Sequence, residues 1–190
     1  METPNKPNRE SKIVINLPKD IFILEATRDS VTTRYYLNKG KCTISLTDSL
    51  RIANQTKKPR RTHCETAEFY KNYYTYMYGL PMKLKDTSTI LENEIEHKNF
   101  KGKDYLVLKA SYEASVGTDV WYFYFDPETY AMEIYQFYRV DDNGNQKNDT
   151  GEYILLSETE TINNIKMPKD RAWYMNKDDR YLGTDFLSAK

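Results

Sequence analysis

The residue types that most often do chemistry in proteins are scarce in this chain of 190 residues. It has two histidines, His63 and His97, and two cysteines, Cys42 and Cys64. Neither histidine lies in an HExxH pattern, and no third nitrogen or thiolate follows at the spacing of a zinc site. Because His63 and Cys64 are adjacent, a regular backbone points their side chains apart. We therefore predict no catalytic centre, no metal site and no cofactor, and we expect surface histidines.

One polar segment has some features of a calcium-binding loop. Asp141, Asn143 and Asn145 alternate as EF-hand ligands do, but Gln146 stands where that loop requires glycine. The pair Asn143-Gly144 is also the commonest signal for a tight hairpin turn, so we favour a turn. The glycine-rich phosphate-binding motifs and the GxSxG nucleophile motif do not occur in the sequence.

The balance of charges argues against a nucleic-acid partner. Lys plus Arg and Asp plus Glu both number 28, which gives a formal charge of zero. A nucleic-acid footprint needs clustered positive charge, and the short basic run Lys57–Arg61 is more typical of a solvated loop. The chain also contains no apolar window of about 18 residues, the length that a membrane-spanning helix needs.

Most of the chain has the alternating pattern of β-strands, and its length fits one domain, 1–190. The strand-like runs are Ile13–Asn16, Ile21–Thr27, Val31–Leu37, Lys41–Leu46, Ile90–Phe100, Tyr105–Tyr112, both halves of residues 119–139, Glu152–Thr159, Thr161–Met167, Arg171–Asn176 and Tyr181–Leu187. Their connections are too short for parallel crossovers, so we predict a mainly β (α+β) fold with an antiparallel sheet of about ten strands.

One segment, Cys64–Gly79, has the pattern of a helix instead. Phe69, Tyr73 and Tyr76 recur at the i, i+4 and i+7 positions of one helical face, and Gly79 followed by Pro81 is a stop signal. We expect this aromatic helix to pack against the sheet.

The most informative stretch is residues 119–139, DVWYFYFDPETYAMEIYQFYR, which we interpret as a hairpin turning at Asp126-Pro127-Glu128-Thr129. Alternate side chains of a strand point to opposite faces. One face of the first strand carries Trp121, Phe123 and Phe125, and the other carries Val120, Tyr122 and Tyr124. Because a surface sheet needs only one apolar face, the second aromatic face is either covered by protein or open to an apolar ligand. The pattern alone leaves a packed core and a ligand cavity both open.

The two cysteines also leave two interpretations open. A Cys42–Cys64 disulfide would close a loop with 21 intervening residues and would stabilise the fold by roughly 3 kcal/mol in the chain-entropy model. In a reducing compartment the same residues would be two thiols.

Four segments resemble a known group of proteins: 121–138, 69–84, 151–156, and 171–185 with its Arg171-Ala172-Trp173-Tyr174 start. Together they are similar to an uncharacterised family of secreted or lipid-anchored bacterial envelope proteins. The strand-Asp-Pro-x-Thr-strand hairpin also resembles that of the outer-membrane lipoprotein-carrier group.

This resemblance implies an open, curved antiparallel half-barrel that wraps one main helix, in a protein of the cell envelope. Carriers of the wider group hold lipid acyl chains on the concave face. We therefore expect a non-enzymatic protein that binds a lipid or another hydrophobic small molecule. The expected apolar wall is Trp121, Phe123, Phe125, Tyr135, Phe137, Tyr73, Tyr74 and Met77. An envelope location also favours the Cys42–Cys64 disulfide. The alternative is a structural or protein-interaction module with a fully packed core.

Members of the resembling family normally begin with a signal peptide and a first helix. Here Met1-Glu2-Thr3-Pro4 has no apolar signal region, so we expect that any membrane attachment would depend on an anchor absent from this sequence. The sequence predicts no particular oligomeric state.

Overall fold

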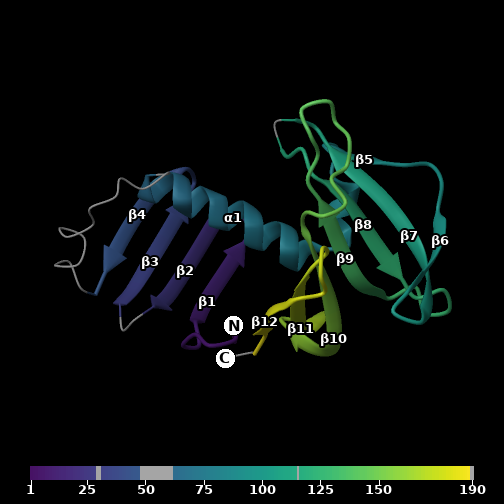
Figure 1. Cartoon of the computed structure of the whole chain (residues 1–190). Helices are drawn as coiled ribbons and strands as arrows, with labels where there is room; N and C mark the ends of the chain where they lie inside the picture. The colour runs from purple at the N-terminus through teal and green to yellow at the C-terminus, as the bar shows by residue number, and fades with distance from the viewer. Residues whose placement is uncertain (29–30, 48–61, 115, 189–190) are drawn as a thin grey trace. The chain divides into compact units, whose positions relative to one another are not determined.

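The structure is a computed structural model, and it describes residues 1–28, 31–47, 62–114 and 116–188. These residues contain twelve β-strands, one α-helix and one short 3-10 helix. The strands form two open antiparallel sheets (Figure 1). The mainly β, antiparallel and open fold predicted from the sequence is therefore confirmed, with one main helix. The basic run Lys57–Arg61 lies outside the described residues.

The chain divides into two compact units, where the sequence analysis expected one domain with one sheet. The helix unit comprises Pro7–Leu80, and the hairpin unit comprises Met1–Lys6 and Pro81–Lys190. Each sheet is assembled from strands that are near one another in the chain. Short connections between neighbouring antiparallel strands occur equally in one large sheet and in two smaller ones. The number of strand-like runs in the sequence therefore could not distinguish one sheet from two.

The helix unit is a four-stranded meander with a helix packed on one face (Figure 1). Its strands are β1 (Glu10–Asn16), β2 (Ile21–Arg28), β3 (Val31–Asn38) and β4 (Lys41–Leu46), and its helix is α1 (His63–Gly79). Strand alternation puts Phe22, Leu24 and Leu37 on the same face, where they form a buried core with Ala67 of the helix.

Two local features fix the start of α1. Thr62 and Glu65 form a capping box, in which the Glu65 backbone N–H donates to Thr62 Oγ1 and the Thr62 N–H donates to Glu65 Oε2. A disulfide joins Cys64, in the first turn of the helix, to Cys42 on β4. His63 opens the helix, and both His63 and His97 are exposed.

The hairpin unit is built on the larger sheet, with strand order β12-β11-β10-β9-β8-β7-β5 and with β6 also paired to β7. Its elements are η1 (Met82–Lys85), β5 (Thr89–Leu91), β6 (Glu96–Phe100), β7 (Lys103–Tyr112), β8 (Val120–Phe125), β9 (Met132–Tyr138), β10 (Glu152–Ile162), β11 (Ile165–Met175) and β12 (Tyr181–Phe186). The expected aromatic hairpin is the β8–β9 pair.

Strand boundaries differ from the expectation at two places. The run Ile90–Phe100 is not one strand, because β5 and β6 pair with opposite halves of β7. Conversely, β10 and β11 form one long hairpin where three short strands were expected. The chain reverses at Asn163 and Asn164, whose φ angles of 51° and 65° suit a tight turn. Pro168 lies within β11, beyond the stretch that pairs with β12.

No helix among the described residues is both long and apolar enough to cross a lipid bilayer.

Candidate functional site

One face of the larger sheet carries a continuous set of aromatic rings, which we call the aromatic face: Trp121, Phe123, Tyr135, Phe137 and Trp173. Trp121 pairs with Phe137, and Phe123 pairs with Tyr135, across the β8–β9 ladder. The next strand places Ile154 opposite Tyr135 and Trp173 opposite Ile154. Directly opposite residues of an antiparallel sheet share a face, so these side chains form two neighbouring rows.

The rings of the aromatic face contact one another. The centroids of Trp121 and Phe137 are 4.9 Å apart, those of Trp121 and Phe123 are 6.1 Å apart, and those of Tyr135 and Trp173 are 6.4 Å apart. The row of Phe123 and Tyr135 is fully buried, with 0 % and 1 % of these residues exposed. Trp121 and Phe137 in the outer row are only half-buried.

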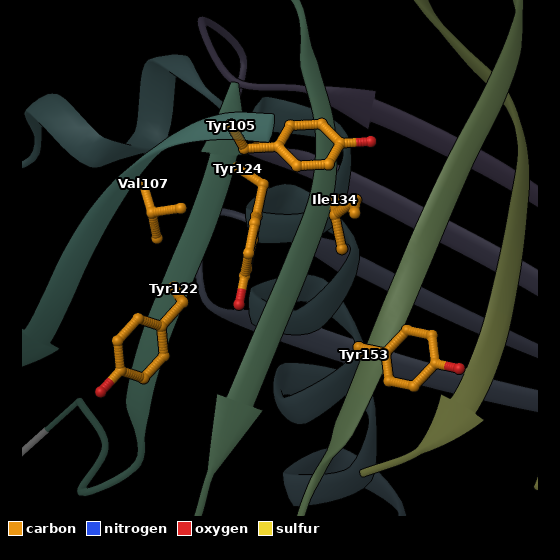
Figure 2. Packing of buried hydrophobic residues seen from close by; sticks show 6 residues of the cluster. All are labelled: Tyr105, Val107, Tyr122, Tyr124, Ile134 and Tyr153. Atoms are coloured by element: carbon orange, nitrogen blue, oxygen red, sulfur yellow. The ribbon is translucent and has the colours of Figure 1, made fainter. Parts of the chain in front are cut away.

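The opposite face of the same sheet is a tyrosine-rich core, which we call the tyrosine face. Figure 2 shows its six buried side chains, which are Tyr105, Val107, Tyr122, Tyr124, Ile134 and Tyr153. Phe100 of β6 closes over this face, because its ring centroid lies 5.4 Å from that of Tyr124 and 5.2 Å from that of Tyr153. The sheet therefore has rings on both faces, and within the hairpin unit β6 helps to cover the tyrosine face.

The hydroxyl groups of the tyrosine face donate hydrogen bonds to protein oxygens. Tyr124 donates to Gln136 Oε1 at 2.5 Å, Tyr105 donates to Glu133 Oε2 at 3.0 Å, and Tyr153 donates to Asp179 Oδ1 at 2.8 Å. Burial raises the pKa of Tyr124 well above that of an exposed tyrosine. With their hydroxyl groups satisfied in this way, these rings have the character of structural core.

The turn between β8 and β9 is held by Asp126. Its Oδ1 atom accepts hydrogen bonds from the backbone N–H groups of Glu128 and Thr129, at 3.0 and 2.8 Å. Lys103 Nζ lies 2.7 Å from Asp126 Oδ2 and 2.8 Å from Glu133 Oε2. The hydrogen bond from Lys103, together with those from Thr129, lowers the pKa of Asp126. This local network explains why the Asp-Pro-Glu-Thr sequence turns the chain here.

The structure places four of the five expected wall residues of the hairpin on one face of the sheet. Trp121, Phe123, Tyr135 and Phe137 share the aromatic face, as strand alternation predicted. Phe125 lies beyond a register shift that falls between Tyr124 and Phe125, opposite Met132, and it is half-buried. Because Phe123 and Tyr135 are buried, the surface available for a ligand narrows to the outer row.

The three expected wall residues of α1 belong to the helix unit. Tyr74 packs against the core of that unit, with its ring centroid 6.5 Å from that of Phe22. Tyr73 contacts the rings of Tyr74 and Phe69, and Met77 is buried. The candidate site built here therefore comprises hairpin residues alone.

Three charged residues lie at the end of the aromatic face next to Trp121 and Phe137. Glu152 is directly opposite Phe137 on β10, while Asp119 and Arg139 adjoin the ends of β8 and β9. Burial raises the pKa of both the Asp119 and Glu152 carboxyl groups, and the positive charge of Arg139 only partly offsets that effect. The sequence analysis did not single out these residues as part of the site. Asp119 and Arg139 could have been found from the sequence, because each lies two residues from Trp121 or Phe137. Glu152 could be placed only from the β9–β10 register.

The backbone carbonyl group of Phe137 is fixed by two neighbouring residues, Asn176 and Gly151. The side chain of Asn176 donates to the backbone oxygens of Phe137 and Thr150, at 2.9 and 2.8 Å. Gly151 has a φ of +75°, and a Cβ atom at this position would lie 1.9 Å from the Phe137 carbonyl oxygen. The close approach explains why glycine occupies this position.

The suspected calcium loop is a hydrogen-bonded turn. Asp141 Oδ1 accepts from the backbone N–H groups of Asn143 and Asn145, at 2.9 and 2.8 Å, and these bonds lower the pKa of Asp141. The described residues contain no cluster of three or more His, Cys, Asp or Glu side chains suited to a metal ion. A shallow depression on the helix unit is lined mainly by polar residues, among them the Glu25–Arg34 ion pair, and includes no expected wall residue.

Sequence comparison identifies the family. The profile of a family of unknown function (DUF6503) matches residues 1–188. The chain belongs to this family. The comparisons found no match among curated proteins and none among solved structures. The aromatic hairpin and the charged residues at its end are features of a member of this family.

Proposed function

We propose that this protein is a non-enzymatic binding protein of the cell envelope that holds an apolar, lipid-like molecule against Trp121 and Phe137. The observation that carries the proposal is the difference in burial along the aromatic face. Phe123 and Tyr135 are fully buried, whereas the stacked pair Trp121 and Phe137 is half-buried. Two large rings in contact form an apolar platform at which a ligand can displace water.

The opposite face of the sheet does not compete for this role. Its rings are covered in part by Phe100, and their hydroxyl groups bond to side chains of the same unit. The resemblance of the Asp-Pro turn hairpin to the lipoprotein-carrier group, which binds acyl chains, supports the same proposal. We derive the envelope location from that resemblance.

A neutral hydrophobic fluorophore, N-phenyl-naphthylamine, tests the proposal directly. We expect it to bind the wild-type chain and to be displaced by dodecyl maltoside below the micellar concentration of the detergent. Truncating Trp121 to Ala removes an indole ring that supplies much of the platform. Because burying apolar area contributes about 25 cal/mol per Å² to the binding free energy, we expect the fluorophore to bind at least tenfold more weakly. Tyr130→Ala, which alters an exposed ring in the hairpin turn, is the matched control.

Lipid extraction and native mass spectrometry of the purified protein provide a second readout. A protein that repeatedly purifies without a bound small molecule, and that leaves the fluorophore unbound, would refute the proposal. It would then favour an interaction module, for which the exposed apolar side chains of Met82, Ile90, Ile95 and Val116 offer candidate contacts.

A further inference from the structure

The outer row of the aromatic face ends on acidic side chains. Trp121 is opposite Phe137, and Phe137 is opposite Glu152, so one cross-strand row runs from an indole through a phenyl ring to a carboxylate. Asp119 precedes Trp121 by two residues, and Arg139 follows Phe137 by two residues. Both residues lie one position beyond the ends of β8 and β9, and the charge of Arg139 acts on the carboxyl groups of both Asp119 and Glu152, so the three side chains lie near one another at this end of the sheet.

Both carboxylates are partly buried, and the charge of Arg139 acts on each of them without direct contact. Within the part of the chain that the structure describes, neither the Asp119 nor the Glu152 side chain forms a hydrogen bond or an ion pair. A partly buried carboxylate without such partners is unfavourable for folding. Burial accordingly raises the pKa of each group. Ionisable groups held in this way are enriched at functional sites.

The charges at this end favour a cation. Asp119 and Glu152 contribute two negative charges when ionised, whereas Arg139 contributes one positive charge and is itself exposed. The faces of Trp and Phe rings attract cations, and quaternary ammonium groups are often recognised by aromatic rings. The stacked rings of Trp121 and Phe137 and the neighbouring carboxylates therefore favour the same class of group. An anionic head group would instead meet two like charges.

We infer that the ligand is an amphiphile with a cationic, ammonium-type head group, which sits beside Asp119 and Glu152 while the adjoining apolar part packs on Trp121 and Phe137. This inference rests on the proposed function, since it names the head group of the ligand held by the same platform. It adds that the site selects by charge as well as by hydrophobicity.

Three amphiphiles with the same dodecyl chain separate the two ideas. Dodecyltrimethylammonium, dodecyl maltoside and dodecyl sulfate are each titrated below their micellar concentration, with displacement of N-phenyl-naphthylamine as the readout. Near-UV circular dichroism checks that the protein stays folded. We expect the cationic amphiphile to bind about tenfold more tightly than the neutral one, which corresponds to about 1.4 kcal/mol. Dodecyl sulfate should bind most weakly.

Substitutions at Asp119, Arg139 and Glu152 test whether these residues cause the preference for the cationic amphiphile. Glu152→Gln and Asp119→Asn should each reduce the cation preference several-fold, and the double variant should abolish it, while affinity for dodecyl maltoside changes less than twofold. Arg139→Gln should strengthen cation binding. Glu128→Gln is the control, because it removes an exposed carboxylate in the hairpin turn and should leave the preference unchanged.

The outcomes distinguish the two proposals. Equal binding of the cationic and neutral amphiphiles would overturn the head-group inference and leave the apolar platform in place. The same conclusion follows if the preference survives in the Asp119 and Glu152 double variant, or if Glu128→Gln reduces it equally. Failure of all three amphiphiles to displace the fluorophore from the folded wild-type protein would overturn the proposed function as well.

Discussion

Glu152 lies directly opposite Phe137 across the β9–β10 ladder. The Glu152 carboxylate therefore lies next to the Phe137 ring. On the other side of Phe137 is Trp121, whose ring stacks on that of Phe137 with the two centroids 4.9 Å apart. Neither residue would be remarked on alone, since carboxylates are common and the chain has seven phenylalanines. Their pairing gives the aromatic face one apolar side and one charged end, which is the arrangement that an amphiphile requires.

The two carboxyl groups at this end should make stability depend on pH in a specific direction. A group whose pKa is raised in the folded state stabilises the protein below its unfolded pKa, which is about 4 for Asp and Glu, and that contribution is lost as the pH rises through the folded pKa. Burial raises the pKa of Asp119 and Glu152 in this way. At neutral pH we therefore expect Glu152→Gln and Asp119→Asn to raise the thermal unfolding midpoint.

The advantage of these variants should disappear in acid, where the wild-type carboxyl groups are protonated in both states. Differential scanning calorimetry at a series of pH values measures the difference. An equal or lower midpoint for both variants at neutral pH would show that Asp119 and Glu152 are satisfied by partners in solution.

Truncation of rings on the aromatic face should separate the buried row from the outer row. Phe123 is fully buried, so Phe123→Ala should lower the free energy of unfolding by about 3–5 kcal/mol. Phe137 is half-buried, and Phe137→Ala should lower it by roughly half as much. Tyr130→Ala, at a position 69 % exposed, should change it by less than about 0.5 kcal/mol.

Chemical denaturation followed by tryptophan fluorescence measures these changes in the hairpin unit. The chain has two tryptophans, Trp121 and Trp173, and both lie in that unit. If Phe137→Ala were as destabilising as Phe123→Ala, the outer row would be packed core in solution, and the site would lose its open surface.

Gly151 should be intolerant of any side chain. It combines a φ of +75° with a Cβ position 1.9 Å from the Phe137 carbonyl oxygen. Gly144 has a similar φ of +82° but nothing within 4 Å of its Cβ position, which makes it a matched control for backbone strain. We expect Gly144→Ala to destabilise by about 1 kcal/mol and Gly151→Ala by considerably more, with weaker binding of N-phenyl-naphthylamine because Phe137 must shift.

Urea denaturation of the two glycine variants, read by tryptophan fluorescence, provides the comparison. Equal effects of the two substitutions would mean that the β9–β10 backbone yields easily at Gly151, so that Phe137 is less firmly held than the structure indicates.

The Cys42–Cys64 disulfide should stabilise the helix unit. It links β4 to the first turn of α1 across a sequence separation of 22, and a loop of this length corresponds to roughly 3 kcal/mol. Replacing both cysteines by serine should lower the unfolding midpoint of the far-UV helical signal, since α1 belongs to the helix unit. A reducing agent should shift the wild-type midpoint similarly and leave the double variant unchanged. A wild-type midpoint that does not respond to reductant would contradict this role.

Local patterns predicted much of this architecture. Alternation of apolar residues identified the β8–β9 hairpin and the two faces of β8, because side-chain direction along a strand depends only on the backbone period. The Asp-Pro-Glu-Thr turn and the stop at Gly79 followed by Pro81 are equally local, since turn and helix-end conformations involve only a few consecutive residues. The antiparallel character followed from connections too short for a parallel crossover.

The tertiary structure alone decided which residues meet. Register between strands places Glu152 beside Phe137 and Trp173 in the same row as Phe123, and register depends on how two strands pair, which the pattern of each strand by itself does not specify. Burial separated Phe123 and Tyr135 from the half-buried Trp121 and Phe137, although the four residues look alike in the sequence. The division into two units was equally hidden, because both sheets are antiparallel and their strands show the same alternating pattern. Composition and periodicity record what each segment prefers, whereas a site depends on the free energy of packing several segments together.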